Sequence, residues 1–331
     1  MSEINFPLIA NCPGTLASGF SSYSNACLKE MFNGKTVSHM LQYQEFSLGD
    51  KQYSKFHDTQ KRVSVSGVQE KFSLLLDKKQ IRLINDAETG TYILKTVPEK
   101  IKNASFMPAN EHLTMQIARQ VFDIETAANC MIFFAKGEPA LLVKRFDFSS
   151  NFKKLAMEDM ASILGKTPQT HGSDYKYNGN YLEIFEALKK IIPAYKIESI
   201  KLYKLLLFNY LFSNGDAHLK NFSILETALG DFRLSPAYDL LNSRIHIDDF
   251  DFALEEGLLP KNIAKGKVKN LFLKLADLVG ISNKKATEIL LFMCSNPEKV
   301  EKLIGNSFLS DKLKRNYLQA YQSRLKKLMK E

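Results

Sequence analysis

The hydrophobic pattern of the chain changes near Phe148, and this change limits the possible folds more than any other feature. Before it, short apolar runs separated by polar turns predict strands over residues 72–77, 81–86, 91–97, 129–135 and 140–148. After it, apolar residues recur every three or four positions, which is typical of amphipathic helices. We therefore expect an α/β (α+β) fold with two lobes, a β-rich N-lobe and a mainly α-helical C-lobe.

Each lobe also contains an exception to its main pattern. Residues 110–122 predict a helix in the β-rich part, and residues 222–225 and 232–235 predict a strand pair in the helical part. Short amphipathic helices are expected at 26–32 and 36–43, and a helix in the segment EDMASILG, residues 158–165.

The expected organisation has three parts. Residues 1–60 form an N-terminal segment of the N-lobe, residues 61–150 the β-rich N-lobe, and residues 151–331 the helical C-lobe. A cleft between two such lobes is a common place for a nucleotide.

Composition narrows the class of protein without naming a function. Hydrophobic residues make up 45% of the 331-residue chain and charged residues 24%, which excludes a disordered protein. The net charge of +9 favours anionic partners. The four cysteines form no C-x-x-C pair, so a structural zinc site is not expected. The beginning does not read as a signal peptide and no apolar run is long enough to span a membrane, so we expect a cytoplasmic protein.

The most informative segment is SNGDAHLKNFSIL, residues 213–225, which follows a strongly apolar helix and precedes a strand. Asp216 and Asn221 have the D-x-x-x-x-N spacing of a kinase catalytic loop, in which Asp accepts the proton of the attacking hydroxyl and Asn holds Mg²⁺. The alternative is an Asp that caps a helix and an Asn in a turn. The strand pair that follows returns the chain to Asp239, which is placed to join Asn221 on the same Mg²⁺ rather than to serve only as a turn residue.

Upstream residues suggest where phosphates would be bound. Gly67 alone is weak evidence for a phosphate loop, and Lys71 is compatible with a solvated strand charge. Lys95 lies inside an apolar strand, as a lysine that grips nucleotide phosphates does, although a lysine at a strand edge can also extend to solvent. Glu111 could pair with Lys95 or could interact favourably with the dipole of the next helix.

Taken in order, several segments resemble the HipA family of bacterial serine/threonine kinases, the toxins of type II toxin–antitoxin modules. The matching segments are SVSGVQEKFSLLL, YILKT, NEHLTMQIAR, LLVKRFDF, MEDMASILG, NGDAHLKNFSIL and SPAYDLLNS, from about residue 63 to residue 243. The chain begins about sixty residues before the Gly-rich loop, so it is most similar to the short HipT-type kinases.

The resemblance implies a set of site residues. Asp216 would be the catalytic base, Asn221 and Asp239 the Mg²⁺ ligands, and Ser64 and Ser66 the autophosphorylation positions. ATP would be bound by residues of the Gly-rich loop, the strands, the hinge and the catalytic loop, namely Ser66, Gly67, Val68, Gln69, Glu70, Lys71, Lys95, Lys144, Arg145, Phe146, His218, Lys220 and Tyr238. Glu158 and Asp159 match a family segment, and for them we expect buried hydrogen bonding.

The resemblance also implies partners and a function. The chain would transfer the γ-phosphate of ATP to a serine of a protein, with an aminoacyl-tRNA synthetase as the implied substrate, and autophosphorylation would inactivate it. A HipB-like DNA-binding antitoxin, and a small HipS-like protein, would bind it in the bacterial cytoplasm, with DNA reached only through the antitoxin and no membrane contact. The alternatives are a small-molecule phosphotransferase of the same broad fold and a catalytically silent nucleic-acid-binding relative. A small-molecule phosphotransferase would carry histidine at the position of Asn214, so Asn214 argues against that alternative.

Overall fold

The protein is described by a computed structural model that covers residues 9–43, 69–85, 87–99, 101–149, 151, 153–247 and 250–330. The chain divides into two compact units. Unit 1 comprises residues 1–116, 127–145 and 303–314, and unit 2 comprises residues 117–126, 146–302 and 315–331. Each unit is described separately below.

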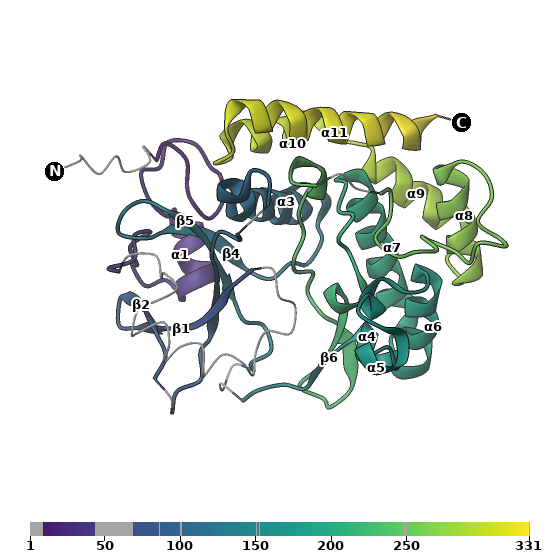
Figure 1. Cartoon of the computed structure of the whole chain (residues 1–331), viewed down its shortest axis with the longest axis horizontal. Coiled ribbons are helices and arrows are strands. Elements are labelled where there is room, and N and C mark those ends of the chain that lie inside the picture. Colours follow the sequence, from purple (N-terminus) through teal and green to yellow (C-terminus); the bar gives the residue numbers. More distant parts are fainter. Residues whose placement is uncertain are drawn as a thin grey trace. The chain divides into compact units, whose positions relative to one another are not determined.

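Unit 1 contains an antiparallel sheet of five strands (Figure 1), in the order β2-β1-β3-β5-β4. The strands are β1 (Lys71–Asp77), β2 (Gln80–Leu83), β3 (Tyr92–Lys95), β4 (Asn129–Phe133) and β5 (Pro139–Lys144). Both expected hairpins, β1–β2 and β4–β5, are confirmed, as is the strand that ends near Pro98. The register places Lys71 opposite Lys95, which fixes the position of Lys95 at the end of β3.

The helices of unit 1 pack on this sheet. Helix α1 (Asn25–Phe32) is capped by Ser24, whose side chain accepts a hydrogen bond from the backbone of Cys27. Its buried face joins the apolar side chains of the strands, and the Tyr92 hydroxyl donates to Met31 O at 2.5 Å. The 3₁₀ turn η1 (Ala104–Phe106) leads into α3 (Met107–Phe122), which confirms the expected helix at 110–122.

The expected helix at residues 36–43 is wrong. This segment instead runs beside the edge strand β4, where Leu41 N donates to Phe133 O at 2.7 Å and Phe133 N donates to His39 O at 2.9 Å. An edge strand offers unpaired backbone groups, and pairing with them replaced the local hydrogen bonds of a helix.

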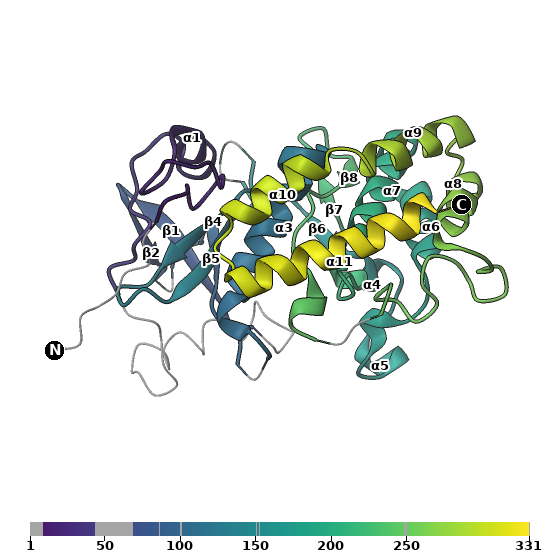
Figure 2. The same ribbon diagram turned by 90° about the horizontal axis from the view of Figure 1, so that it is seen from above.

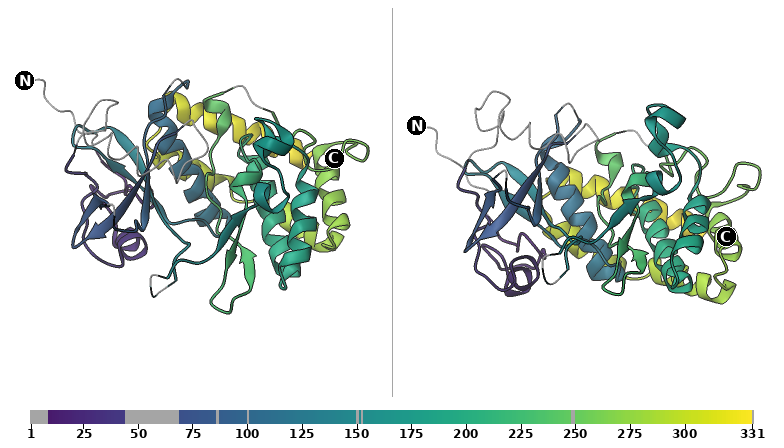
Figure 3. Two further views of the ribbon diagram at one scale, coloured as in Figure 1. Left: turned by 60° about the horizontal axis from the view of Figure 1, so that its bottom comes forward. Right: turned by 90° about the horizontal axis from the view of Figure 1, so that it is seen from below.

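Unit 2 is mainly helical, and Figure 3 shows its helices in teal, light green and yellow. Its helices after residue 159 run from α4 to the greater part of α11. They are α4 (Met160–Ile163), α5 (Pro168–His171), α6 (Tyr181–Ile191), α7 (Tyr195–Leu211), α8 (Val268–Leu278), α9 (Asn283–Met293), α10 (Pro297–Asn306) and α11 (Asp311–Met329), with the 3₁₀ turns η2 (Tyr175–Tyr177), η3 (Leu219–Asn221) and η4 (Ser243–Ile245). The first residues of α11 and the last residues of α10 belong to unit 1.

Helix α7 forms the centre of unit 2. Nearly every residue from Leu202 to Leu211 is buried, which explains the continuous apolar run that the sequence carries there. Aromatic stacking continues past its end, since Phe212 lies 4.4 Å from Phe208 and 5.0 Å from Tyr321 of α11, measured between ring centroids. The loop that follows α7 therefore starts from a fixed point.

A small antiparallel sheet carries the chain onward from that loop, and Figure 2 shows its strands next to one another. Its order is β6 (Met157–Asp159), β7 (Ser223–Glu226) and β8 (Phe232–Leu234). The expected strand pair β7–β8 is confirmed. The expectation of a helix from residue 158 is wrong by two residues, because 157–159 pair with β7 and α4 begins only at Met160, where Asp159 caps it.

In the part of the chain that the structure describes, no helix combines the length and the apolar character needed to cross a membrane.

Candidate active site

The loop between α7 and β7 carries the central residues of the site. Ser213 begins it in the left-handed conformation, with φ 54°, and η3 ends it at Asn221. The Asn221 amide donates from Nδ2 to Asp216 O at 3.0 Å, which closes the loop on itself. Asp216 is half-buried, and its Oδ1 accepts a hydrogen bond of 2.7 Å from the Tyr177 hydroxyl. The loop is thus ordered by its own side chains.

Asp239 lies on the segment that returns from β8. It adopts φ 56°, a left-handed conformation that is uncommon for a residue with a side chain and that Asp adopts more readily than most. The preceding Tyr238 attaches this segment to the catalytic loop, because its hydroxyl is 2.5 Å from Ser223 Oγ and donates to Lys220 O at 2.9 Å. Tyr238 also contacts Phe146, with 5.9 Å between ring centroids.

His218 lies close enough to Asp216 and Asp239 for both charges to act on its imidazole. It is 5% exposed, and its ring meets the Tyr177 ring edge-on, with 5.3 Å between centroids. Burial lowers the pKa of His218 to about 4, against the charges of Asp216 and Asp239, which act in the opposite direction. The imidazole is therefore neutral at pH 7.

These residues fit a Mg²⁺ site of the type that is completed by a nucleotide. Among the described residues no group of three His, Cys, Asp or Glu side chains could hold a metal, so a cage made of protein ligands alone is not formed there. Mg²⁺ needs only one or two protein ligands when phosphates and water supply the rest. Since Asn221 uses Nδ2 to bind Asp216 O, its Oδ1 is turned away from that bond, and Oδ1 is the atom that a hard cation would take together with the Asp239 carboxylate.

Unit 1 contains a buried ion pair. Lys95 Nζ lies 2.5 Å from Glu111 Oε1, and the two side chains are only 6% and 3% exposed. Lys95 stands at the end of β3, and Glu111 lies in α3. The geometry decides between the alternatives left open by the sequence, because Lys95 does not extend to solvent and Glu111 is its partner.

The other residues expected to bind ATP in unit 1 are only partly described. Ser64, Ser66, Gly67 and Val68 lie outside the described residues. Gln69 and Glu70 come directly before β1. Gln69 Nε2 donates to Thr96 O at 2.7 Å. Burial, with a contribution from the charge of Glu99, raises the pKa of Glu70. Lys71 is the first residue of β1 and faces Lys95 in the register.

The expected hinge, residues 144–146, falls where unit 1 gives way to unit 2 after Arg145. The Lys144 ammonium binds the end of α1, donating to Glu30 O at 2.8 Å and to Asn33 Oδ1 at 2.9 Å. The Arg145 guanidinium reaches Gly90 O at 3.4 Å. Both side chains are thus used within unit 1, and the backbone N of Lys144 and of Arg145 also donates there, to Ala128 O at 2.8 Å and to Thr91 O at 2.9 Å.

A cavity of about 680 Å³ in unit 2 lies next to Tyr238. This volume is within the range of small-molecule sites. Its lining combines polar and apolar side chains from β6, from β7 and from the segments around them, namely Asp147, Lys154, Leu155, Ala156, Met157, Asp159, Lys220, Ser223, Glu226 and Tyr238. The expectation of buried hydrogen bonding is wrong for Glu158, which is exposed on an edge strand, while Asp159 is half-buried and caps α4 by accepting from Ser162 N at 3.0 Å.

Sequence reasoning missed two side chains that contact the catalytic loop. Tyr177 is 39 positions from Asp216. Arg324, in α11, is 1% exposed, lies 4.6 Å over the Tyr210 ring, forms an ion pair with Asp251 and reaches Ser213 Oγ at 3.4 Å. The basic, amphipathic pattern of α11 does not distinguish Arg324 from the other basic residues of the helix, because a lysine or arginine in such a helix is usually exposed.

A catalytic-loop Asp and Asn, a second Asp after a strand pair and a buried Lys–Glu pair define a kinase-like protein. The family described as HipA-like C-terminal domain matches residues 63–300, and the chain belongs to this family. It is 25% identical over 289 residues to a protein of Haemophilus influenzae whose name describes it as a candidate kinase, covering 80% of this chain and 82% of that protein. It is 26% identical over 225 residues to the serine/threonine-protein kinase toxin HipA of Shewanella oneidensis, covering 62% of this chain and 50% of the toxin.

Solved structures show the same fold. The HipA toxin of Shewanella oneidensis, determined together with HipB and operator DNA, matches with a TM-score of 0.60 and 22% identity over 80% of this chain and 63% of the toxin. The proinflammatory kinase CtkA of Helicobacter pylori matches with a TM-score of 0.53 and 16% identity, over 75% of this chain and 90% of CtkA. The resemblance to the HipA family and the kinase-like fold class expected from the sequence are confirmed.

Proposed function

We propose that the chain is an ATP-dependent protein serine/threonine kinase that acts as the toxin of a HipBA- or HipBST-like module in the bacterial cytoplasm. The observation that carries the proposal is the loop between α7 and β7, in which the Tyr177 hydroxyl donates to Asp216 Oδ1 and the Asn221 amide donates from Nδ2 to Asp216 O. Fold and family membership support the same reading.

In the proposed reaction the Asp216 carboxylate takes the proton of a substrate serine hydroxyl. The serine oxygen then forms a bond to the γ-phosphorus of ATP, the bond from that phosphorus to the β–γ bridging oxygen breaks, and ADP leaves. Lys95, fixed by Glu111, binds phosphate oxygens. Asn221 and Asp239 would hold Mg²⁺, which when bound neutralises charge on the phosphates.

The finer parts of the proposal concern ligands and partners. We assign the nucleoside to the unit 2 cavity beside Tyr238, since its size and its mixture of carboxylates and apolar atoms suit a ribose and a base. The proposed protein substrate is an aminoacyl-tRNA synthetase. The proposed partners are a HipB-like antitoxin and a HipS-like protein. Autophosphorylation at Ser64 or Ser66 switches the enzyme off. A phosphate there adds about −1.5 to −2 charges and repels ATP.

The test is intact mass and peptide mapping after incubation with Mg²⁺ and ATP. Wild type and the exposed control Asp277→Asn are expected to gain phosphate on Ser64 or Ser66, and Asp216→Asn is expected to gain none. Phosphate retained in Asp216→Asn would refute the role of this residue. If ATP binds but none of the three proteins gains phosphate, transfer to the chain's own loop is excluded and a small-molecule acceptor is favoured.

A further inference from the structure

The Tyr177 hydroxyl bonds directly to the carboxylate that we assign as the catalytic base. It donates to Asp216 Oδ1 at 2.7 Å, while its ring packs edge-on against His218 at an interplanar angle of 75°. We propose that Tyr177 is a positioning residue for phosphoryl transfer, which orients Asp216 so that Oδ2 receives the proton of the substrate hydroxyl. This inference rests on the proposed function and adds a residue that neither the motif nor the family resemblance supplied.

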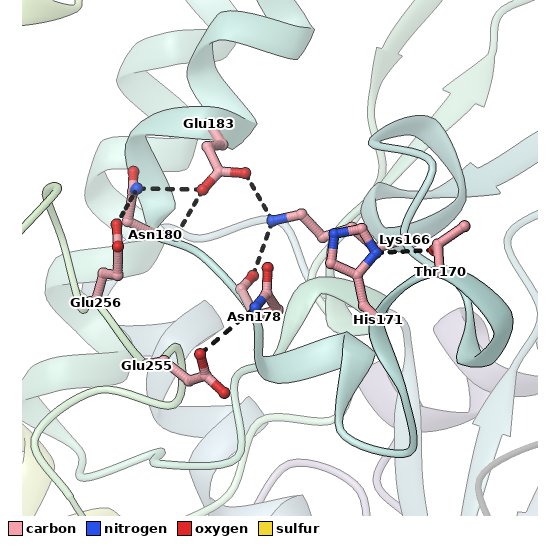
Figure 4. A network of polar contacts seen from close by, with 8 residues as sticks. All are labelled: Lys166, Thr170, His171, Asn178, Asn180, Glu183, Glu255 and Glu256. Carbon is pink, nitrogen blue, oxygen red and sulfur yellow. Dashed lines mark hydrogen bonds and ion pairs between the residues drawn. The ribbon is translucent and has the colours of Figure 1, made fainter.

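Tyr177 is held in place by the polar network that Figure 4 shows around the preceding and following segments. Lys166, only 7% exposed in its side chain, binds Glu183 Oε2 at 2.6 Å and Asn178 O at 2.9 Å. Glu255 N also donates to Tyr177 O at 2.9 Å, and before the Cα the Tyr177 N donates to Asp174 O at 2.8 Å. The backbone on both sides of the Tyr177 Cα is therefore hydrogen-bonded, so the phenol has little freedom to leave the carboxylate.

The network ends on a rigid element. Asn180 donates from its backbone N and from Nδ2 to Glu183 Oε1, at 3.0 and 3.1 Å, and this pair forms the capping box of α6. Asn180 Nδ2 also donates to Glu256 Oε2 at 2.9 Å, and Glu256 N donates to Gly179 O at 3.0 Å. Because α6 packs against α7, which leads into the catalytic loop, both ends of the Tyr177–Asp216 bond are fixed to the same helical core of unit 2.

The chemical consequence follows from the two oxygens of a carboxylate. A neutral phenol can serve an ionised carboxylate only as a donor, and its bond to Oδ1 restricts rotation of the Asp216 carboxylate. The second oxygen then has one defined direction for the acceptor hydroxyl. Positioning of this kind reduces the reorganisation needed in the transition state, whereas it does little for the binding of ATP.

His218 limits what else Tyr177 could do. The imidazole is buried, its ring meets the Tyr177 ring edge-on, and its Nδ1 has no hydrogen-bond partner among the described residues. Lys176 is the nearby cation, and its ammonium lies 5.0 Å from the centre of the Tyr177 ring rather than on the carboxylate. The phenol is thus the side-chain donor that the described residues bring to Oδ1.

The test compares steady-state phosphoryl transfer by wild type, Tyr177→Phe and the matched control Tyr175→Phe, which lies in the same 3₁₀ turn. Tyr177→Phe keeps the ring contact with His218 and removes only the hydroxyl. We expect kcat to fall about 10- to 100-fold, the range of one hydrogen bond to a charged group, with the KM for ATP changed less than about threefold. Tyr175→Phe should match wild type.

A double-variant comparison separates positioning from a merely structural role. If Tyr177 acts through Asp216, Tyr177→Phe in an Asp216→Asn background will lower the residual rate by less than about twofold. Tyr181→Phe provides the structural reference, because it removes a hydroxyl that donates to Ala217 O of the same loop at 2.7 Å. If Tyr177→Phe lowers the rate only as far as it lowers the folded fraction, or multiplies the effect of Asp216→Asn, the proposal is wrong.

The outcomes also distinguish this proposal from the proposed function. An active wild type, an inactive Asp216→Asn and an unchanged Tyr177→Phe would overturn the role of Tyr177 and leave the kinase assignment intact. A wild type that transfers no phosphate to any acceptor would overturn both.

Discussion

Replacing Lys95 by methionine separates the structural role of the Lys95–Glu111 pair from its role in phosphate binding. Methionine keeps most of the apolar stem and removes the ammonium. Glu111 is then left as a carboxylate that is 3% exposed and has lost its cation at 2.5 Å. Breaking one side of a buried pair costs about 3–5 kcal/mol, which is a large part of the stability of an ordinary domain.

The double variant Lys95→Met/Glu111→Gln removes the stranded charge. Its free energy of unfolding should return to within about 1–2 kcal/mol of wild type, because the neutral amide costs far less to bury. Binding of ATP should not return in the double variant, since the ammonium that we propose to meet the phosphates is still absent. Stability and nucleotide affinity are therefore expected to change independently.

The assay must report on unit 1 itself, because the chain has two compact units and contains no tryptophan. Hydrogen exchange measured by mass spectrometry on peptides from β3 and from the first part of α3 gives the local stability, and isothermal titration with Mg²⁺ and ATP gives the affinity. If Lys95→Met left exchange in β3 unchanged, the burial argument would be refuted. ATP binding by the double variant at wild-type affinity would refute the assignment of Lys95 to the phosphates.

Three further predictions concern stability. Burial lowers the pKa of both His112 and His218 to about 4, so from about pH 6.5 down to 4 the unfolded chain binds protons that the folded chain does not. The free energy of unfolding, measured with urea, should therefore fall as the pH is lowered, by up to about 2.7 kcal/mol per pH unit. A constant free energy of unfolding from pH 7 to 5 would contradict this. Arg324→Met should lower the free energy of unfolding of unit 2 by about 2–3 kcal/mol in thermal melts, and a loss below about 0.5 kcal/mol would show that the buried guanidinium is not important. Gly179→Ala should cost about 1–3 kcal/mol, since φ is 90° and a Cβ would collide with the Glu183 carboxylate, whereas the control Gly305→Ala, in open space within α10, should be neutral or stabilising.

The elements that sequence predicted correctly are those whose pattern is local. The hairpins β1–β2 and β7–β8 carry apolar runs and turn residues within about a dozen positions, and α6 and α7 carry apolar side chains at helical spacing. Residues 158 and 159 were expected to be helical, but they pair with β7, which lies more than sixty positions away. Residues 36–43 were also expected to be helical, yet their backbone bonds to β4. No local pattern contains either of these pairings.

The residues of the candidate site also fall into those that the sequence indicated and those that only the structure brought in. Asp216, Asn221 and Asp239 were predicted because their spacing, and the strand pair between them, are written in a short stretch of chain. Lys95 was predicted from its unusual place in an apolar strand, although its pairing with Glu111 was left open. No sequence pattern indicated a role for Tyr177, because a tyrosine in a polar loop can have many roles and only the folded chain brings it to Asp216.

The sequence by itself thus determined most of the order of strands and helices and the family, and it supplied the loop residues that we propose for catalysis, since all of these depend on side chains close together along the chain. Only the tertiary structure decided which groups meet across long separations: Lys95 with Glu111, Tyr177 with Asp216, and Arg324 with the beginning of the catalytic loop. The physical reason is that burial and hydrogen-bond satisfaction are properties of the packed molecule. A charge becomes costly, and a phenol becomes a positioning group, only when folding has removed the water around it.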